Sequence, residues 1–159
     1  MADLFQDAMI TELRKSTMIA AINGGKFCPC CDQYVKVYRR SITNIMAKML
    51  IEAYNNFSVD DYFHVSEVSS KRKTGGGDFA KLRYWGFIKA KPHDDGQSGK
   101  KHSGYWRITP FGVSFVRGEL KVHKYALIYN GNFKEFEGES VSIRECLGEK
   151  FDYNELMEM

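Results

Sequence analysis

The stretch from Ser66 to Arg107 constrains the fold of this chain most strongly, because its glycines divide it into short segments and its charge is predominantly positive. Between Ser69 and Arg107, ten lysines or arginines stand against three aspartates, which leaves a net charge of +7, whereas the whole chain carries +3. The basic character of the chain is therefore concentrated here. Clustered cations of this kind are what contact with phosphate groups requires.

The order of the expected elements in this stretch follows from its helix-capping and turn-forming residues. Ser66 opens a short helix, the three glycines 75–77 form a turn, and a second short helix runs from Asp78 to about Trp85. A strand at 87–90, a polar glycine-rich loop at 92–104 and a returning strand at 105–109 follow. The second helix is expected to turn Phe79 and Leu82 inward and Lys81 and Arg83 outward.

Two motifs in this stretch resemble a known family. The run Leu82-Arg-Tyr-Trp-Gly86-Phe-Ile-Lys resembles the end of the recognition helix and the next strand in winged-helix transcription regulators of the multiple-antibiotic-resistance and PadR types. Thr109-Pro110-Phe-Gly resembles the step that starts the next helix in the same families. The resemblance covers about Ser41 to Val116 and implies an α+β fold with a winged helix-turn-helix core.

The resemblance also implies a mode of binding. Recognition helices of this class enter the major groove of double-stranded DNA, and wings touch the minor groove or the backbone. By this analogy the contacts come from the 79–85 helix, the 92–104 wing and the basic run before the glycines. The implied DNA-binding residues are Lys71, Arg72, Lys73, Lys81, Arg83, Tyr84, Lys100, Lys101, His102 and Arg107. Two alternatives stay open: half-buried core for Tyr84, and helix-dipole compensation for the basic run.

The chain outside this core divides into two appended parts. Residues 1–40 hold a helix from Asp3 to about Ile22, which could mediate a homodimer, and a cysteine-rich segment. The core, residues 41–117, opens with a helix capped by Ser41. Residues 118–159 hold a β-hairpin turning at Asn130-Gly131 and acidic short helices, with eight acids against three bases after position 131. Together these parts are expected to form one compact unit.

The sequence Cys28-Pro-Cys30-Cys31 resembles the metal-binding knuckle of rubredoxins and zinc ribbons, which implies zinc binding by Cys28 and Cys31. It departs from that pattern because Asp32 stands where glycine is usual and no second Cys-x-x-Cys follows. A structural turn without metal is the alternative. A redox site is rejected, because a strand rather than a helix follows the thiols.

Three functional classes are weighed. DNA binding has the charge cluster and the element order behind it, while the acidic end and exposed aromatics motivate a protein-interaction module that binds a host or phage protein. No poised catalytic set stands out, so an enzyme is not expected. No apolar run is long enough to span a bilayer, and a cytoplasmic protein without a membrane partner is expected. The whole layout also resembles small uncharacterised proteins of tailed bacteriophages, which implies the cytoplasm of a bacterial host.

Overall fold

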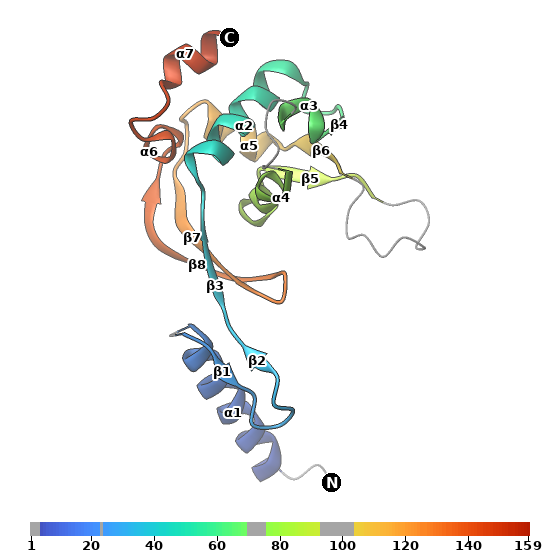
Figure 1. Cartoon of the computed structure of the whole chain (residues 1–159), viewed down its shortest axis with the longest axis vertical. Helices are drawn as coiled ribbons and strands as arrows, with labels where there is room; N and C mark the ends of the chain where they lie inside the picture. Colours follow the sequence, from blue (N-terminus) through green and yellow to red (C-terminus); the bar gives the residue numbers. More distant parts are fainter. Residues whose placement is uncertain (1–3, 23, 70–75, 93–103) are drawn as a thin grey trace. The chain divides into compact units, whose positions relative to one another are not determined.

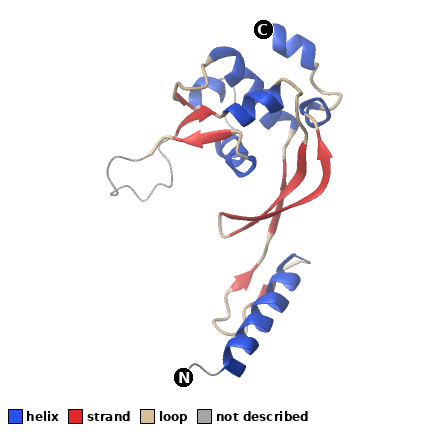
Figure 2. Ribbon diagram, turned by 180° about the vertical axis from the view of Figure 1, so that it is seen from behind, coloured by secondary structure: helices blue, strands red, loops and turns tan. Residues whose placement is uncertain are grey.

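The structure, a computed structural model, describes residues 4–22, 24–69, 76–92 and 104–159 (Figures 1 and 2). The fold is mixed α+β, and its strands form three small sheets in the described part of the chain. Two compact units are present. Unit 1 comprises residues 1–40 and 125–137, and unit 2 comprises residues 41–124 and 138–159.

Unit 1 contains the expected N-terminal helix, α1 (Leu4–Ile22), followed by strands β1 (Lys26–Phe27) and β2 (Tyr34–Val35). The two strands pair antiparallel, with Phe27 opposite Tyr34. A small core forms where Ala21, Val35, Val37 and Leu127 are buried together. Residues 34–38 alternate as a strand does, because Val35 and Val37 are buried whereas Tyr34, Lys36 and Tyr38 are exposed.

A second sheet has the order β3-β7-β8, made of β3 (Tyr38–Ser41), β7 (Val122–Tyr129) and β8 (Asn132–Val141). Both residues of the Asn130-Gly131 turn have positive φ angles, 50° and 76°. This is the geometry of a type I′ turn, whose twist matches that of the flanking strands. The hairpin predicted from the sequence is confirmed.

Unit 2 is built around α2 (Asn44–Asn56), which buries one face including Met46, Leu50 and Ala53. The predicted cap is wrong: Ser41 is the last residue of β3, and Thr43 caps the helix instead. The Met46 N–H donates to Thr43 Oγ1 at 3.2 Å. Ser41 and Thr43 are both residues that can cap a helix, but Ser41 belongs to strand β3, so Thr43 caps α2.

The segment after α2 forms β4 (Phe63–His64), α3 (Ser66–Ser69), α4 (Gly76–Ala80) and the 3₁₀ helix η1 (Lys81–Trp85). The predicted single helix at 79–85 is therefore wrong in type, although Phe79 and Leu82 are buried as expected. Gly86 explains the tight end: it adopts a left-handed φ of 78°, and its N–H donates to Arg83 O.

The third sheet has the order β4-β6-β5, with β5 (Ile88–Ala90) and β6 (Tyr105–Ile108). Its inner face buries Trp106 and Phe63 against Phe79. Helix α5 (Pro110–Val116) begins at the predicted residue, and Phe115 stacks on Phe87 with ring centroids 4.4 Å apart. Two short helices, α6 (Ile143–Leu147) and α7 (Tyr153–Glu158), complete unit 2.

Candidate nucleic-acid interface

The outer face of the β4-β6-β5 sheet collects cationic and aromatic side chains. Strand geometry sends alternate residues to opposite faces, and directly paired residues share a face. Ile88 pairs with Ile108 on the buried side, whereas Lys89 pairs with Arg107 on the other side. We call the outer set the basic face. It consists of Tyr62, His64, Lys89, Lys91, Tyr105 and Arg107.

Cations and rings contact each other across the basic face. The Lys91 ammonium lies 5.8 Å from the centre of the Tyr62 ring and 5.7 Å from that of Tyr105. The Arg107 guanidinium lies 5.8 Å from the Tyr62 ring centre. The two tyrosines keep 40% and 43% of their surface exposed. These distances fall within the range of cation–π attraction, which orients the cations without neutralising them.

The basic face carries no internal counter-charge for its cations. Within the described residues, Lys89, Lys91 and Arg107 form no ion pair with a carboxylate. Arg107 Nε is buried and has no hydrogen-bond partner in the same part of the chain. One carboxylate lies at the edge of the face, because Glu67 accepts the backbone N–H of His64 at 2.7 Å. The centre of the face is therefore a positive surface with unused hydrogen-bonding capacity.

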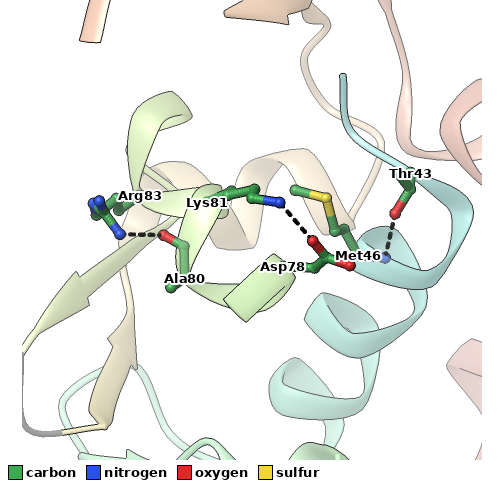
Figure 3. Close-up of polar contacts among 6 residues, drawn as sticks. All are labelled: Thr43, Met46, Asp78, Ala80, Lys81 and Arg83. Atoms are coloured by element: carbon green, nitrogen blue, oxygen red, sulfur yellow. Dashed lines mark hydrogen bonds and ion pairs between the residues drawn. The ribbon is translucent and has the colours of Figure 1, made fainter. Parts of the chain in front are cut away.

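The α4–η1 segment presents its cations differently (Figure 3). Lys81 Nζ lies 2.6 Å from Asp78 Oδ1, three residues earlier. Arg83 donates to Ala80 O at 3.2 Å and to the Tyr84 hydroxyl at 3.0 Å, with its guanidinium 4.6 Å from the Tyr84 ring centre. Both cations and Tyr84 are half-buried. These expected DNA-contacting residues thus lie on one short segment, where the two cations already have partners in the protein.

The other expected contact residues are distributed unevenly over the described chain. Arg107 lies at the centre of the basic face. Lys71, Arg72 and Lys73, and likewise Lys100, Lys101 and His102, lie outside the described residues. Sequence reasoning missed the other five residues of the basic face, although the alternation of residues 105–108 was a usable signal for Tyr105. The five are Tyr62, His64, Lys89, Lys91 and Tyr105.

The cysteine knuckle lies in the turn between β1 and β2. The Cys28 N–H donates to Gln33 O at 2.7 Å, and the Asp32 N–H donates to Cys28 O at 2.9 Å. Asp32 takes the left-handed position, with φ of 58°, so the turn forms without the usual glycine. The pKa of the Cys28 thiol is lowered chiefly because its sulfur accepts the backbone N–H of Cys30, and then that of Cys31.

Metal ligands are incomplete at this turn. No group of three or more His, Cys, Asp or Glu side chains is placed to hold a metal ion anywhere in the part of the chain that the structure describes. The fourth cysteine, Cys146, belongs to unit 2, where burial raises the pKa of its thiol to about 12. Cys146 is thus a protonated, half-buried thiol at neutral pH.

Comparison of the chain with models of protein families, with curated protein sequences and with solved structures found no match. None of the helices that the structure describes has the length and apolar character needed to cross a membrane.

Proposed function

We propose that the chain binds double-stranded DNA through the basic face, in a regulatory or architectural role, with unit 2 acting as a winged-helix core. The observation that carries the proposal is the cross-strand pair Lys89–Arg107. Like charges directly opposite each other destabilise a sheet. Lys89 and Arg107 form such a pair, and neither has a carboxylate partner in the described chain. This arrangement is expected of a surface that binds an anionic ligand.

The hydrogen-bonding capacity of Arg107 supports the same proposal. Its buried Nε lacks a partner among the described residues, while its guanidinium is held over the Tyr62 ring. A guanidinium fork matches the oxygens of a phosphate, and Arg is favoured over Lys wherever planar recognition is needed. A DNA phosphate that meets the rest of this guanidinium would provide the negative charge that the described residues do not supply.

The order of elements supports the winged-helix interpretation. Helices α2, α3 and α4–η1 precede the hairpin formed by β5 and β6, and β4 adds a third strand to it. In such folds the segment joining the last two strands is the wing. Lys100, Lys101 and His102, which lie outside the described residues, remain expected DNA contacts by this analogy. Lys81 and Arg83 would have to exchange their protein partners for phosphates.

The salt dependence of binding tests the proposal. Each phosphate neutralised on duplex DNA contributes about −0.9 to the slope of log K against log salt. The three cations of the basic face alone would give a slope of about −2.7, which weakens binding about 40-fold between about 50 and 200 mM salt. The measurement is fluorescence anisotropy of a labelled duplex titrated with the full chain at several salt concentrations.

A charge-matched pair of variants locates the binding surface. Lys89→Ala/Arg107→Ala should flatten the salt slope by about two, because each lost phosphate contact removes about one unit. Lys121→Ala/Lys150→Ala removes the same charge from other exposed positions of unit 2 and should leave the slope unchanged. Equal slopes for the two variants would refute the assignment of the basic face.

A protein partner is the second candidate, and one observation favours it. Phe133 and Phe136 lie on β8 with 40% and 39% of their surface exposed and their ring centroids 4.6 Å apart. If Lys89→Glu/Arg107→Glu captures a bacterial protein as well as the wild type does, while Phe133→Ser/Phe136→Ser captures none, protein binding replaces DNA binding as the better account.

A further inference from the structure

The basic face holds its rings and cations in two rows that cross the strands β4, β6 and β5 (Figure 1). His64 pairs with Tyr105, and the same register continued to the next outward residues places Tyr62 beside Arg107. The 5.8 Å between the Arg107 guanidinium and the Tyr62 ring centre agrees with this placement. One row is Tyr62, Arg107 and Lys89, and the other is His64, Tyr105 and Lys91. Each row therefore combines one tyrosine with at least one cation, and the rows are about 7 Å apart along the strands.

The two tyrosine rings are exposed, and neighbouring side chains hold them in place. Tyr62 and Tyr105 keep 40% and 43% of their surface exposed. The Lys91 ammonium lies at nearly equal distances from the two ring centres, 5.8 and 5.7 Å. The His64 ring meets the Tyr105 ring in a T-shaped contact, with centroids 5.0 Å apart. Rings that the protein has already ordered lose little conformational freedom when a ligand binds.

Paired DNA leaves such rings without a stacking partner. In a duplex each base is covered on both sides by its neighbours, so a protein meets phosphates, sugars and base edges. Unpaired bases offer their flat faces as well. Proteins that bind single strands combine a positive surface for the phosphates with aromatic side chains on which the bases stack. The basic face has both components, and they lie in the same two rows.

We propose that the basic face also binds single-stranded DNA, with one base stacked on Tyr62 and a neighbouring base on Tyr105. Lys89, Lys91 and Arg107 contact phosphates of the same strand. The inference rests on the proposed function, because it uses the same cations for DNA phosphates. Paired DNA supplies phosphates alone, whereas an unpaired segment supplies phosphates and stacking bases. A duplex with a single-stranded tail is therefore bound more tightly than the same duplex without the tail.

An abasic tail separates stacking from charge, because it carries the same phosphates without bases. Three labelled ligands are titrated with the full chain in fluorescence anisotropy: a blunt duplex, the duplex with an oligothymidine tail, and the duplex with an abasic tail of equal length. Each stacked base strengthens binding about fivefold or more, so the oligothymidine tail should bind about 25-fold or more tighter than the abasic tail.

The outcomes of this titration distinguish the two proposals. Equal affinity for the two tails would overturn the stacking inference and leave duplex binding intact. Tight binding of the oligothymidine tail without binding of the blunt duplex would support the inference and count against a duplex as the ligand. No binding of any of the three would overturn both. A preference for an oligouridine tail over the oligothymidine tail would overturn the assignment to DNA.

Tyrosine variants locate the stacked bases. Tyr62→Ala and Tyr105→Ala should each weaken binding of the oligothymidine tail about fivefold or more and leave the abasic tail unaffected. Tyr62→Phe/Tyr105→Phe keeps both rings and should bind as the wild type does. Tyr38→Ala is the control, because Tyr38 is an exposed tyrosine of unit 1 that also has cations near its ring. Circular dichroism checks that each variant is folded. Equal losses on the two tails, or a loss in Tyr38→Ala as large as in the other two, would overturn the placement of the bases.

Discussion

Replacing Gly112 by alanine should destabilise unit 2 through one close backbone contact. Gly112 lies in the first turn of α5, where its N–H donates to Thr109 Oγ1 at 3.1 Å. A Cβ built at this position would lie 3.1 Å from both the carbonyl carbon and the Cα of Phe87, and closer still to the Phe87 oxygen. Those atoms belong to the backbone leading into β5 and cannot move aside as a flexible side chain would.

The magnitude follows from two opposing terms. Forcing a methyl group into a packed site costs up to about 3 kcal/mol. Alanine in place of glycine inside a helix returns about 1 kcal/mol. The free energy of unfolding of Gly112→Ala should therefore fall by about 2 kcal/mol, which corresponds to a drop in Tm of about 4–8 °C for a chain of this size.

A second helical glycine provides the control. An added Cβ at Gly77, in α4, would meet no atom within 4 Å. Gly77→Ala should therefore leave the free energy of unfolding unchanged or raise it by up to about 1 kcal/mol. Both variants are compared with the wild type by urea unfolding followed by circular dichroism. Equal stability of Gly112→Ala and the wild type would refute the close packing of α5 on the start of β5.

Three further outcomes are expected. Thr43→Ala should lower the free energy of unfolding by about 1 kcal/mol in urea titrations, because Thr43 caps α2. Ser41→Ala should change that free energy little. A larger loss of stability in Ser41→Ala than in Thr43→Ala would contradict the assigned cap. Lys81→Ala should weaken duplex binding in anisotropy less than Lys91→Ala, because Lys81 already pairs with a carboxylate; a larger loss at Lys81 would move the interface to the helix. The raised pKa of Cys146, about 12 against 9.0, means that the folded state holds its proton longer than the unfolded state does. Its contribution to stability is therefore complete below about pH 9 and is lost as the pH rises toward 12, and a Cys146→Ala variant should show a flatter fall of unfolding free energy over that range.

Local signals predicted much of the secondary structure. Helix α1, helix α5 and the hairpin at Asn130-Gly131 lie where the sequence places them, because each has a strong signal at its end. Gly86 ends η1 with a left-handed φ of 78°, a geometry that favours glycine. Such features depend on a few adjacent residues, and tertiary packing has little scope to override them.

Features that depend on choices between near-equal local alternatives were not predictable. Ser41 and Thr43 are both good caps, and only the extent of β3 decides between them. The change from α4 to a 3₁₀ turn likewise depends on how the segment meets Gly86. The options lie close together in propensity, which alone does not decide between them.

The candidate interface was predictable in composition but not in position. The charge count placed a net +7 between Ser69 and Arg107, the stretch that contains most of the basic face, yet it could not say which cations pair internally. Asp78 neutralises Lys81, whereas Lys89 and Arg107 come to lie opposite each other only through the register of β5 and β6. Tyr62 joins them from a segment more than 40 positions from Arg107, a contact that no local pattern encodes.

The most direct test of DNA binding through the basic face is a residue-resolved map of the contact. Backbone amide chemical shifts of the ¹⁵N-labelled full chain are recorded as a short duplex is added at low salt. The largest changes are expected at Lys89, Lys91, Tyr105 and Arg107, and they should disappear at high salt. Changes confined to other parts of unit 2, or no changes at low salt, would contradict the account.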